Sequence, residues 1–231
     1  HLSFRNISWK WKDLSAIIKT GLPSFFRQGL ASIATVMLNV NAAVYGDAAV
    51  AAMSVVGKVF MLILSVLIGF GQGYQPVVGF NYGAGCYKRV KQSFTFTTIV
   101  SFVMMGILAV AGFIFAPQVI QLFTKADAQV LEIGTYAMRA QCLALFIQPL
   151  GVIANMTFQS IGKPAEATFL SACRQGVFFL PLILILPQLW QLRGVELTQP
   201  LADVLTFVVC FPFLFKFFND LNQKIVKHES E

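Results

Sequence analysis

Apolar residues form six long runs along this chain, and short turns rich in Gly, Pro, Lys or Asp separate them. About 20 apolar residues cross the hydrocarbon core of a bilayer as a helix, so each run predicts one membrane-spanning helix. The predicted spans are residues 21–45, 47–81, 94–115, 133–160, 165–190 and 201–218. The predicted fold class is therefore an all-α integral membrane protein whose six transmembrane helices, within residues 21–218, form one unit.

The two ends of the chain have different patterns from the spans. Residues 1–20 alternate bulky apolar side chains with Arg5, Lys10, Lys12 and Lys19, which predicts an amphipathic lead-in on the cytoplasmic surface. Residues 219–231 are polar and predict a disordered cytoplasmic tail.

A polar stripe runs along the first predicted span. Its members recur at intervals of three or four residues, which places them on one helical face: Ser24, Gln28, Ser32, Thr35 and Asn39. Polar groups in hydrocarbon raise the free energy unless they face water or protein. The stripe predicts the wall of a water-accessible cavity, and hydrogen bonding between helices is the alternative.

The second span ends in a glycine- and glutamine-rich stretch. Gln72 and Gln75 share a helical face beside Pro76, and four glycines permit close helix contact or local unwinding: Gly69, Gly71, Gly73 and Gly79. The run is longer than one crossing needs, so it must protrude, tilt or break, and this cluster is the expected place. Either a transport pathway or a packed helix with satisfied glutamines explains the pattern.

The fourth span has the pattern most typical of a pathway helix. Its amides recur on one face: Gln141, Gln148, Asn155 and Gln159. Pro149 and Gly151 weaken the backbone in the middle, which predicts a break that can expose carbonyl groups.

Arg174 is the charge that lies deepest in a predicted span. It stands beside Thr168, Ser171 and Gln175 and needs a partner, for which a backbone carbonyl, a glutamine or water are the candidates. The fifth span has no acid that can neutralise it. Asp203 is expected at the outer end of the sixth span.

Composition and charge place the chain in a membrane. Of the 231 residues, 57% are hydrophobic and 12% are charged, and the mean hydropathy is +0.71. The net charge of +7 comes mainly from loops on one side, which is the positive-inside pattern of a multi-pass plasma-membrane protein with both termini cytoplasmic. Anionic membrane lipid therefore explains the charge, and no nucleic-acid partner is expected.

Catalytic and metal-binding patterns are lacking. The two histidines, His1 and His228, are terminal, the four cysteines have no CxxC spacing, and no carboxylate pair lies at membrane depth. We therefore expect neither an enzyme nor a bound cofactor or metal.

Several motifs resemble the second half of the multidrug and toxic compound extrusion (MATE) transporters, in particular their MepA-like bacterial branch. The motifs are GQGYQPVVGFNYGAGCYKRVKQS at 71–93, IGKPAEATFLSACRQGVFFLPL at 161–182, LRGVELTQPLADVLT at 192–206 and GLPSFFRQGL at 21–30. The resemblance implies one six-helix lobe of a twelve-helix transporter, whose partner is a missing N-terminal lobe. Because the first residue is His1 rather than Met, we also expect a fragment or a processed product.

The resemblance further implies a cation-coupled antiporter that exports lipophilic, often cationic compounds while Na⁺ or H⁺ enters. Some members carry a coupling acid in the helices that match residues 21–45 and 133–160, but here these spans have no central Asp or Glu. We therefore expect the coupling site in the missing lobe, and a cavity wall in this one. The predicted substrate-cavity residues are Gln28, Asn39, Gln72, Gln75, Gln148, Asn155, Met156, Phe158 and Arg174.

Two other functions stay open. A lipid-linked oligosaccharide flippase shares this superfamily's fold, but such proteins line their cavity with several arginines, and only Arg27, Arg139 and Arg174 are candidates here. A half-transporter that packs in the membrane without transporting is the second alternative.

Overall fold

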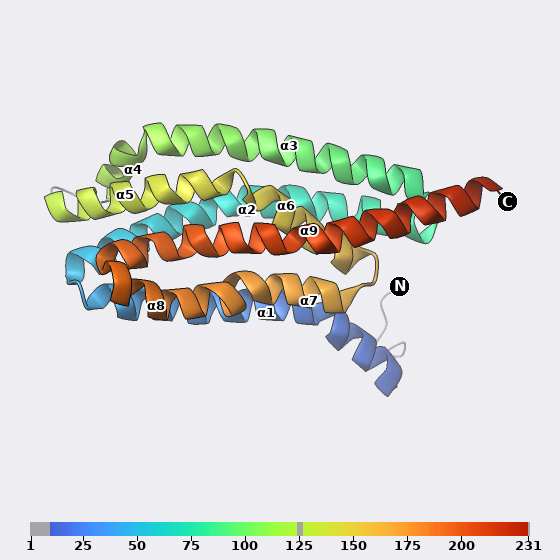
Figure 1. The fold of residues 1–231 in the computed structure, drawn as a ribbon, viewed down its shortest axis with the longest axis horizontal. Helices are drawn as coiled ribbons and strands as arrows, with labels where there is room; N and C mark the ends of the chain where they lie inside the picture. Colours follow the sequence, from blue (N-terminus) through green and yellow to red (C-terminus); the bar gives the residue numbers. More distant parts are fainter. Residues whose placement is uncertain (1–9, 124–126, 231) are drawn as a thin grey trace, which may run out of the picture.

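The computed structural model describes residues 10–123 and 127–230 as one bundle of helices (Figure 1). The elements are α1 (Trp11–Ala43), α2 (Asp47–Gly83), α3 (Tyr87–Ile114), α4 (Ala116–Phe123), α5 (Ala128–Leu145), α6 (Gln148–Ser160), α7 (Pro164–Ala172), the π-helical segment η2 (Cys173–Phe179), α8 (Leu180–Trp190) and α9 (Leu192–Ser230). The start of α1, the end of α9 and the α6–α7 turn lie at one end of the bundle, and the α8–α9 turn lies at the other (Figure 1). We call the first the terminal end and the second the opposite end.

Four of the described helices are long and apolar enough to cross a membrane, and the bent pair α5–α6 makes five if it counts as one span. The all-α membrane fold is therefore confirmed, whereas the count of six spans stays a prediction. α1 is not among these helices, although its length is adequate, because Arg27, Gln28, Asn39 and Asn41 lower its mean hydropathy. Residues 1–9 of the predicted lead-in lie outside the described residues, and the rest of it is continuous with the span in α1.

α2 is one unbroken helix of 37 residues that includes Pro76, so the Gly/Pro cluster does not break it. Two of the glycines do allow close contact with α6. A Cβ atom on Gly71 would lie 2.2 Å from Met156 Sδ, and one on Gly79 would lie 3.3 Å from the Ser160 carbonyl oxygen. The cluster therefore serves packing between α2 and α6.

The predicted break in the fourth span is confirmed. α5 ends at Leu145, α6 begins at Gln148, and the two helices are bent by 54°. Pro149 lies in the first turn of α6, where its missing N–H group leaves no helical hydrogen bond unmade.

The fifth span is helical throughout but changes its winding where α7 passes into η2. This π-helical segment, which contains Arg174, was not predicted, because no Gly or Pro precedes it at its start.

α9 corrects the prediction for the C-terminal tail. It runs for 39 residues to Ser230, so residues 219–230 are helical rather than disordered. Polar contacts at the terminal end stabilise this extension. Lys224 donates to Tyr82 Oη at 2.7 Å, Lys91 donates to Asn222 at 3.1 Å, and Lys163 pairs with Asp220 at 3.5 Å.

The core consists of two apolar clusters along the bundle. One includes Leu67, Met105 and Ile183, and the other, nearer the terminal end, includes Val78, Phe94, Phe158 and Phe217. Many large apolar side chains remain exposed on α3, including Phe96, Ile107 and Ile114, as expected of a helix that faces lipid.

Candidate functional site

The polar stripe of α1 lies largely on the surface of the lobe. Gln28, Ser32 and Thr35 are exposed and Asn39 is half-buried. The hydroxyl groups of Ser32 and Thr35 donate to carbonyl groups one turn back, at 3.1 and 2.8 Å, so they need no neighbouring helix. These two members of the stripe do not join helices within this lobe, whereas Ser24 does, because it accepts a hydrogen bond from Gln159 on α6.

α2 presents a second exposed set of polar side chains. Lys58, Ser65 and Gln72 recur every seven residues, which places them on one face, and all three are exposed. We call the exposed residues Gln28, Ser32, Thr35, Lys58, Ser65 and Gln72 the open polar surface. The hydroxyl groups of this surface bond to carbonyl groups of their own helices. In a bilayer the exposed amides of Gln28 and Gln72 and the charge of Lys58 need water or another protein beside them.

Gln75 is half-buried and belongs to a chain of amides that links three helices. It donates to Gln159 Oε1 at 3.1 Å, and Gln159 Nε2 donates to Ser24 Oγ at 3.2 Å. α6 is thereby tied to α1 and α2 near the terminal end.

Four predicted cavity residues on α6 are buried inside the lobe. Gln148 is 7% exposed, Asn155 is 8% exposed, and Met156 and Phe158 are 2% exposed. Asn155 Nδ2 donates to the Ala167 carbonyl group and, at 2.8 Å, to Ser171 Oγ, so it joins α6 to α7. That these four residues contact substrate stays a prediction. In this conformation their side chains have almost no exposed surface for such a contact.

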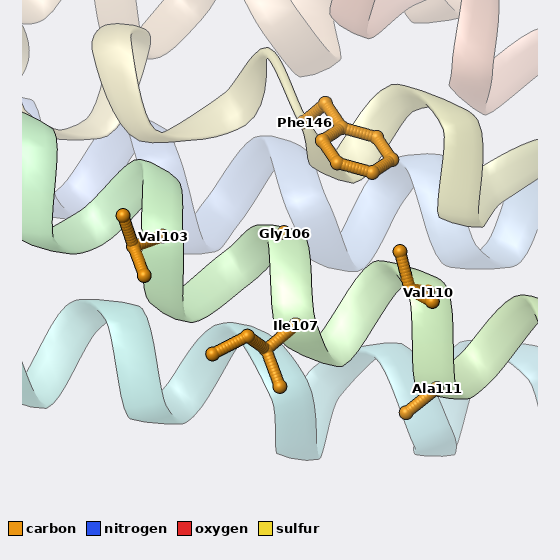
Figure 2. Close-up of a pocket in the computed structure, with 6 residues that line it drawn as sticks. All are labelled: Val103, Gly106, Ile107, Val110, Ala111 and Phe146. Atoms are coloured by element: carbon orange, nitrogen blue, oxygen red, sulfur yellow. The ribbon is translucent and has the colours of Figure 1, made fainter.

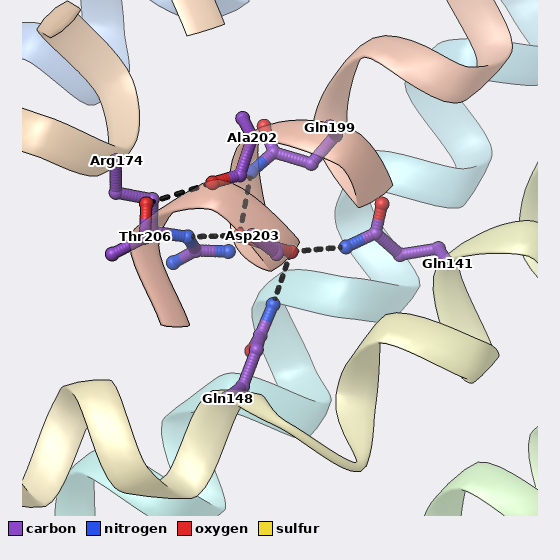
Figure 3. A network of polar contacts seen from close by, with 7 residues as sticks. All are labelled: Gln141, Gln148, Arg174, Gln199, Ala202, Asp203 and Thr206. Atoms are coloured by element: carbon purple, nitrogen blue, oxygen red, sulfur yellow. Dashed lines mark hydrogen bonds and ion pairs between the residues drawn. The ribbon is translucent and has the colours of Figure 1, made fainter. Parts of the chain in front are cut away.

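A buried charged cluster lies between α5, α6, η2 and α9 (Figure 3). Its centre is Asp203, which is 4% exposed. Gln141 and Gln148 donate to Asp203 Oδ2 at 2.9 and 2.6 Å. Arg174 Nε and Gln199 donate to Oδ1 at 2.6 and 3.3 Å.

Arg174 is the fifth member of the cluster and carries its positive charge. Its side chain is 25% exposed, whereas that of Asp203 is 1% exposed. Four N–H donors and one guanidinium charge stabilise the ionised carboxylate, and a carboxylate buried without them would be unstable. This arrangement is a completed ion pair rather than a vacant cation site.

The sequence reading identified that Arg174 needed a partner but not which residue supplied it. It placed Asp203 at the outer end of a span that began at 201. α9 instead begins at Leu192, so Asp203 lies about three turns inside the helix. No pattern within one helix identifies Asp203 as the partner, because this ion pair depends on how η2 packs against α9.

Glu196 forms a second buried ion pair near the opposite end. Its side chain is 1% exposed and accepts from Arg193 Nη1 at 3.3 Å, while the Arg193 guanidinium stacks over the Tyr136 ring at 3.7 Å. A pocket of about 320 Å³ opens there, lined by Tyr45, Gln129, Glu132, Ile133, Leu192, Arg193 and Glu196.

A larger groove, of about 530 Å³, lies on α3 beside the break between α5 and α6 (Figure 2). Its lining is apolar: Val103, Gly106, Ile107, Val110, Ala111 and Phe146. It has no polar side chain that could orient a charged ligand, so we do not assign it as the substrate site. Among the described residues, no group of three or more His, Cys, Asp or Glu side chains is placed to hold a metal ion.

A family profile and several curated proteins match this chain. The MatE family profile matches residues 23–185. The multidrug export protein MepA of Staphylococcus haemolyticus is 23% identical over 202 residues, which are 86% of this chain and 43% of that protein. MepA of Staphylococcus aureus strain bovine RF122 / ET3-1 is 26% identical over 194 residues, which are 83% of this chain and 42% of that protein.

Solved structures share the fold. A crystal structure of MATE in complex with MaL6 superposes with a TM-score of 0.87 at 24% identity, over 96% of this chain and 50% of that one. The outward-facing conformation of a multidrug resistance MATE family transporter of the MOP superfamily superposes with a TM-score of 0.86 at 24% identity, over the same shares.

The chain spans about half the length of the curated relatives it matches. The family profile covers most of the chain, and the fold agrees with that of solved MATE structures over nearly all of it. This chain belongs to the MatE family.

Proposed function

We propose that this chain is the second lobe of a multidrug efflux transporter, and that its open polar surface borders the substrate cavity between two lobes. The observation that carries the proposal is the exposure of polar side chains on helices that otherwise present apolar groups: Gln28, Ser32 and Thr35 on α1, and Gln72 on α2. The similarity to MepA proteins and their greater length support it.

The part of this surface around Gln28 and Gln72 suits weakly specific binding of amphipathic compounds, and its one charged side chain, Lys58, lies 14 residues before Gln72 on α2. Neutral amides accept and donate hydrogen bonds without fixing a charge, and the neighbouring apolar surface contributes area. Half-buried Asn39 and Gln75 extend the same lining inward.

The transport cycle we propose is antiport, in which a compound leaves as Na⁺ or H⁺ enters. The coupling site belongs to the other lobe, because Asp203 already carries a full set of donors and an arginine in this one. The protein would lie in the plasma membrane with both termini cytoplasmic. This orientation requires the start of α1 and the end of α9 to lie on the same side of the membrane, and both lie at the terminal end of the bundle (Figure 1).

Drug-resistance measurements test the proposal in the complete protein that contains this lobe. Gln28→Leu combined with Gln72→Leu should lower resistance to cationic compounds at equal expression, since the open polar surface loses two amides. Gln188→Leu is the matched control, because Gln188 is exposed on α8 and, among the described residues, bonds within its own helix, to Leu184 O. Unchanged resistance in the double variant would contradict the proposal.

A further inference from the structure

The two glutamines that contact Asp203 lie on opposite sides of a helix break. Gln141 belongs to the last turns of α5, and Gln148 is the first residue of α6. Both amides donate to the same oxygen, Asp203 Oδ2, at 2.9 and 2.6 Å (Figure 3). One carboxylate oxygen therefore connects both arms of the helix pair.

The backbone at the break does not fix the angle by itself. The regular helical ladder stops at Leu145, and Ile147 N donates to Ala144 O at 3.2 Å, a tighter turn than the helical one. Interrupted ladders of this kind bend readily unless side chains hold them.

The carboxylate is anchored independently of the two arms. Its other oxygen accepts from Arg174 on η2 and from Gln199 on α9 itself. At 4% exposure of Asp203, water has little access to replace a lost contact. The amide oxygen of Gln148 has no hydrogen-bond partner within the described residues, so its amide is held through the carboxylate.

The far end of α6 reaches the proposed cavity wall. Gln159 accepts from Gln75 on α2 and donates to Ser24 on α1. Gln159 lies 11 residues after Gln148, so a change of angle at the start of α6 moves Gln159 at the end of an arm of about 16 Å.

We propose that Asp203 is a positioning residue that holds α5 and α6 at their angle and thereby fixes where Gln159 meets the cavity wall. The effect of this positioning on export rests on the proposed function, whereas its effect on the angle between α5 and α6 does not. A measurement of the angle therefore distinguishes failure of this inference from failure of the proposed function.

The experiment measures distances across the break by pulsed electron paramagnetic resonance in the complete protein in lipid nanodiscs. Spin labels replace Leu143 on α5 and Ala165, which is exposed and lies five residues after the end of α6. All native cysteines of the complete protein, including the four of this chain, are first changed to alanine. A second label pair, at Phe96 and Ile114, lies within the single helix α3 and reports general loss of order.

Asp203→Asn should broaden and shift the distance distribution across the break and leave the α3 pair unchanged. Asp203→Glu retains a carboxylate and should restore much of the native distribution. Glu196→Gln is the matched control, because it removes a buried acid from the same helix that bonds to Arg193 and not to the break. It should leave both label pairs unchanged.

Gln148→Met provides an independent test if Asp203→Asn does not fold. It removes one arm's contact and leaves the ion pair between Arg174 and Asp203 in place. It should shift the distribution across the break as Asp203→Asn does. Native distributions in Asp203→Asn or in Gln148→Met would overturn the inference, and so would an equal shift in Glu196→Gln.

Discussion

The polar side chains of this lobe differ in whether their hydrogen-bonding groups already have partners. Asp203 has four donors around a buried carboxylate, and Glu196 has an arginine that is itself half-exposed. Exposed Gln28 and Gln72 keep their amides free for water or ligand. Residues of the first kind stabilise the lobe, and those of the second kind are available for recognition.

Removing one member of the buried ion pair should destabilise the lobe more than removing both. Asp203→Leu leaves the Arg174 guanidinium without its carboxylate, and breaking a buried pair typically lowers the free energy of unfolding by roughly 3–5 kcal/mol. Arg174→Met combined with Asp203→Leu should recover part of that loss. Thermal unfolding in detergent measures both, and additive losses in the double variant would contradict this account.

Gly194 should tolerate no side chain. A Cβ atom there would lie 2.2 Å from Leu186 O, which is backbone at the end of α8 and cannot move aside as a flexible side chain can. Gly194→Ala should lower stability by at least about 1–3 kcal/mol through overpacking. Gly57→Ala is the matched control because its added Cβ meets nothing within 4 Å. Equal melting temperatures for the two variants would show that α8 and α9 do not approach this closely.

At the scale of elements, the pattern of apolar and polar residues predicted helices well and their joints less well. The break between α5 and α6 was foreseen from Pro149 and Gly151, because both residues weaken a helix locally. The sequence did not predict that α2 continues unbroken through Pro76. Gly71 and Gly79 pack against α6, and such a tertiary contact cannot be read from the pattern of one helix. The helical tail after residue 218 likewise depends on Tyr82 and Lys91, which are distant in sequence.

For the polar residues of the site too, the sequence predicted what local geometry determines and not what depends on packing between helices. The spacing of Ser24, Gln28 and Ser32 placed them on one face, which local geometry alone determines. The burial of Gln148 and Asn155 and the role of Asp203 depend on which helices pack together. Periodicity in one helix carries no information about that.

The joint between α6 and α7 should depend on Asn155. Its amide bonds to a backbone carbonyl and a hydroxyl of α7, and Asn155→Leu would leave the Ser171 hydroxyl group and the Ala167 carbonyl without this donor. The expected loss is about 1–3 kcal/mol in the free energy of unfolding. Differential scanning fluorimetry against Gln188→Leu, which should be neutral, checks it. A neutral Asn155→Leu would mean that the two helices are held by apolar packing alone.

For the whole molecule, the balance of exposed groups indicates what surrounds each side. α3 presents large apolar side chains suited to lipid. α1 and α2 also expose apolar side chains, among them Val36 and Met61, and the open polar surface lies among these. In the proposed transporter, the other lobe would face that polar surface across an aqueous cavity, and the relatives are long enough to contain such a lobe.

Thiol labelling tests the aqueous cavity most directly. Single cysteines at positions 28 and 72, in a complete protein free of native cysteines, should react with a membrane-impermeant maleimide, and bound drug should slow the reaction. A cysteine at the lipid-facing position 107 should not react, nor should one at the buried position 155. If positions 28 and 72 react no faster than position 107, the open polar surface does not border water, and the proposed export pathway through this lobe is contradicted.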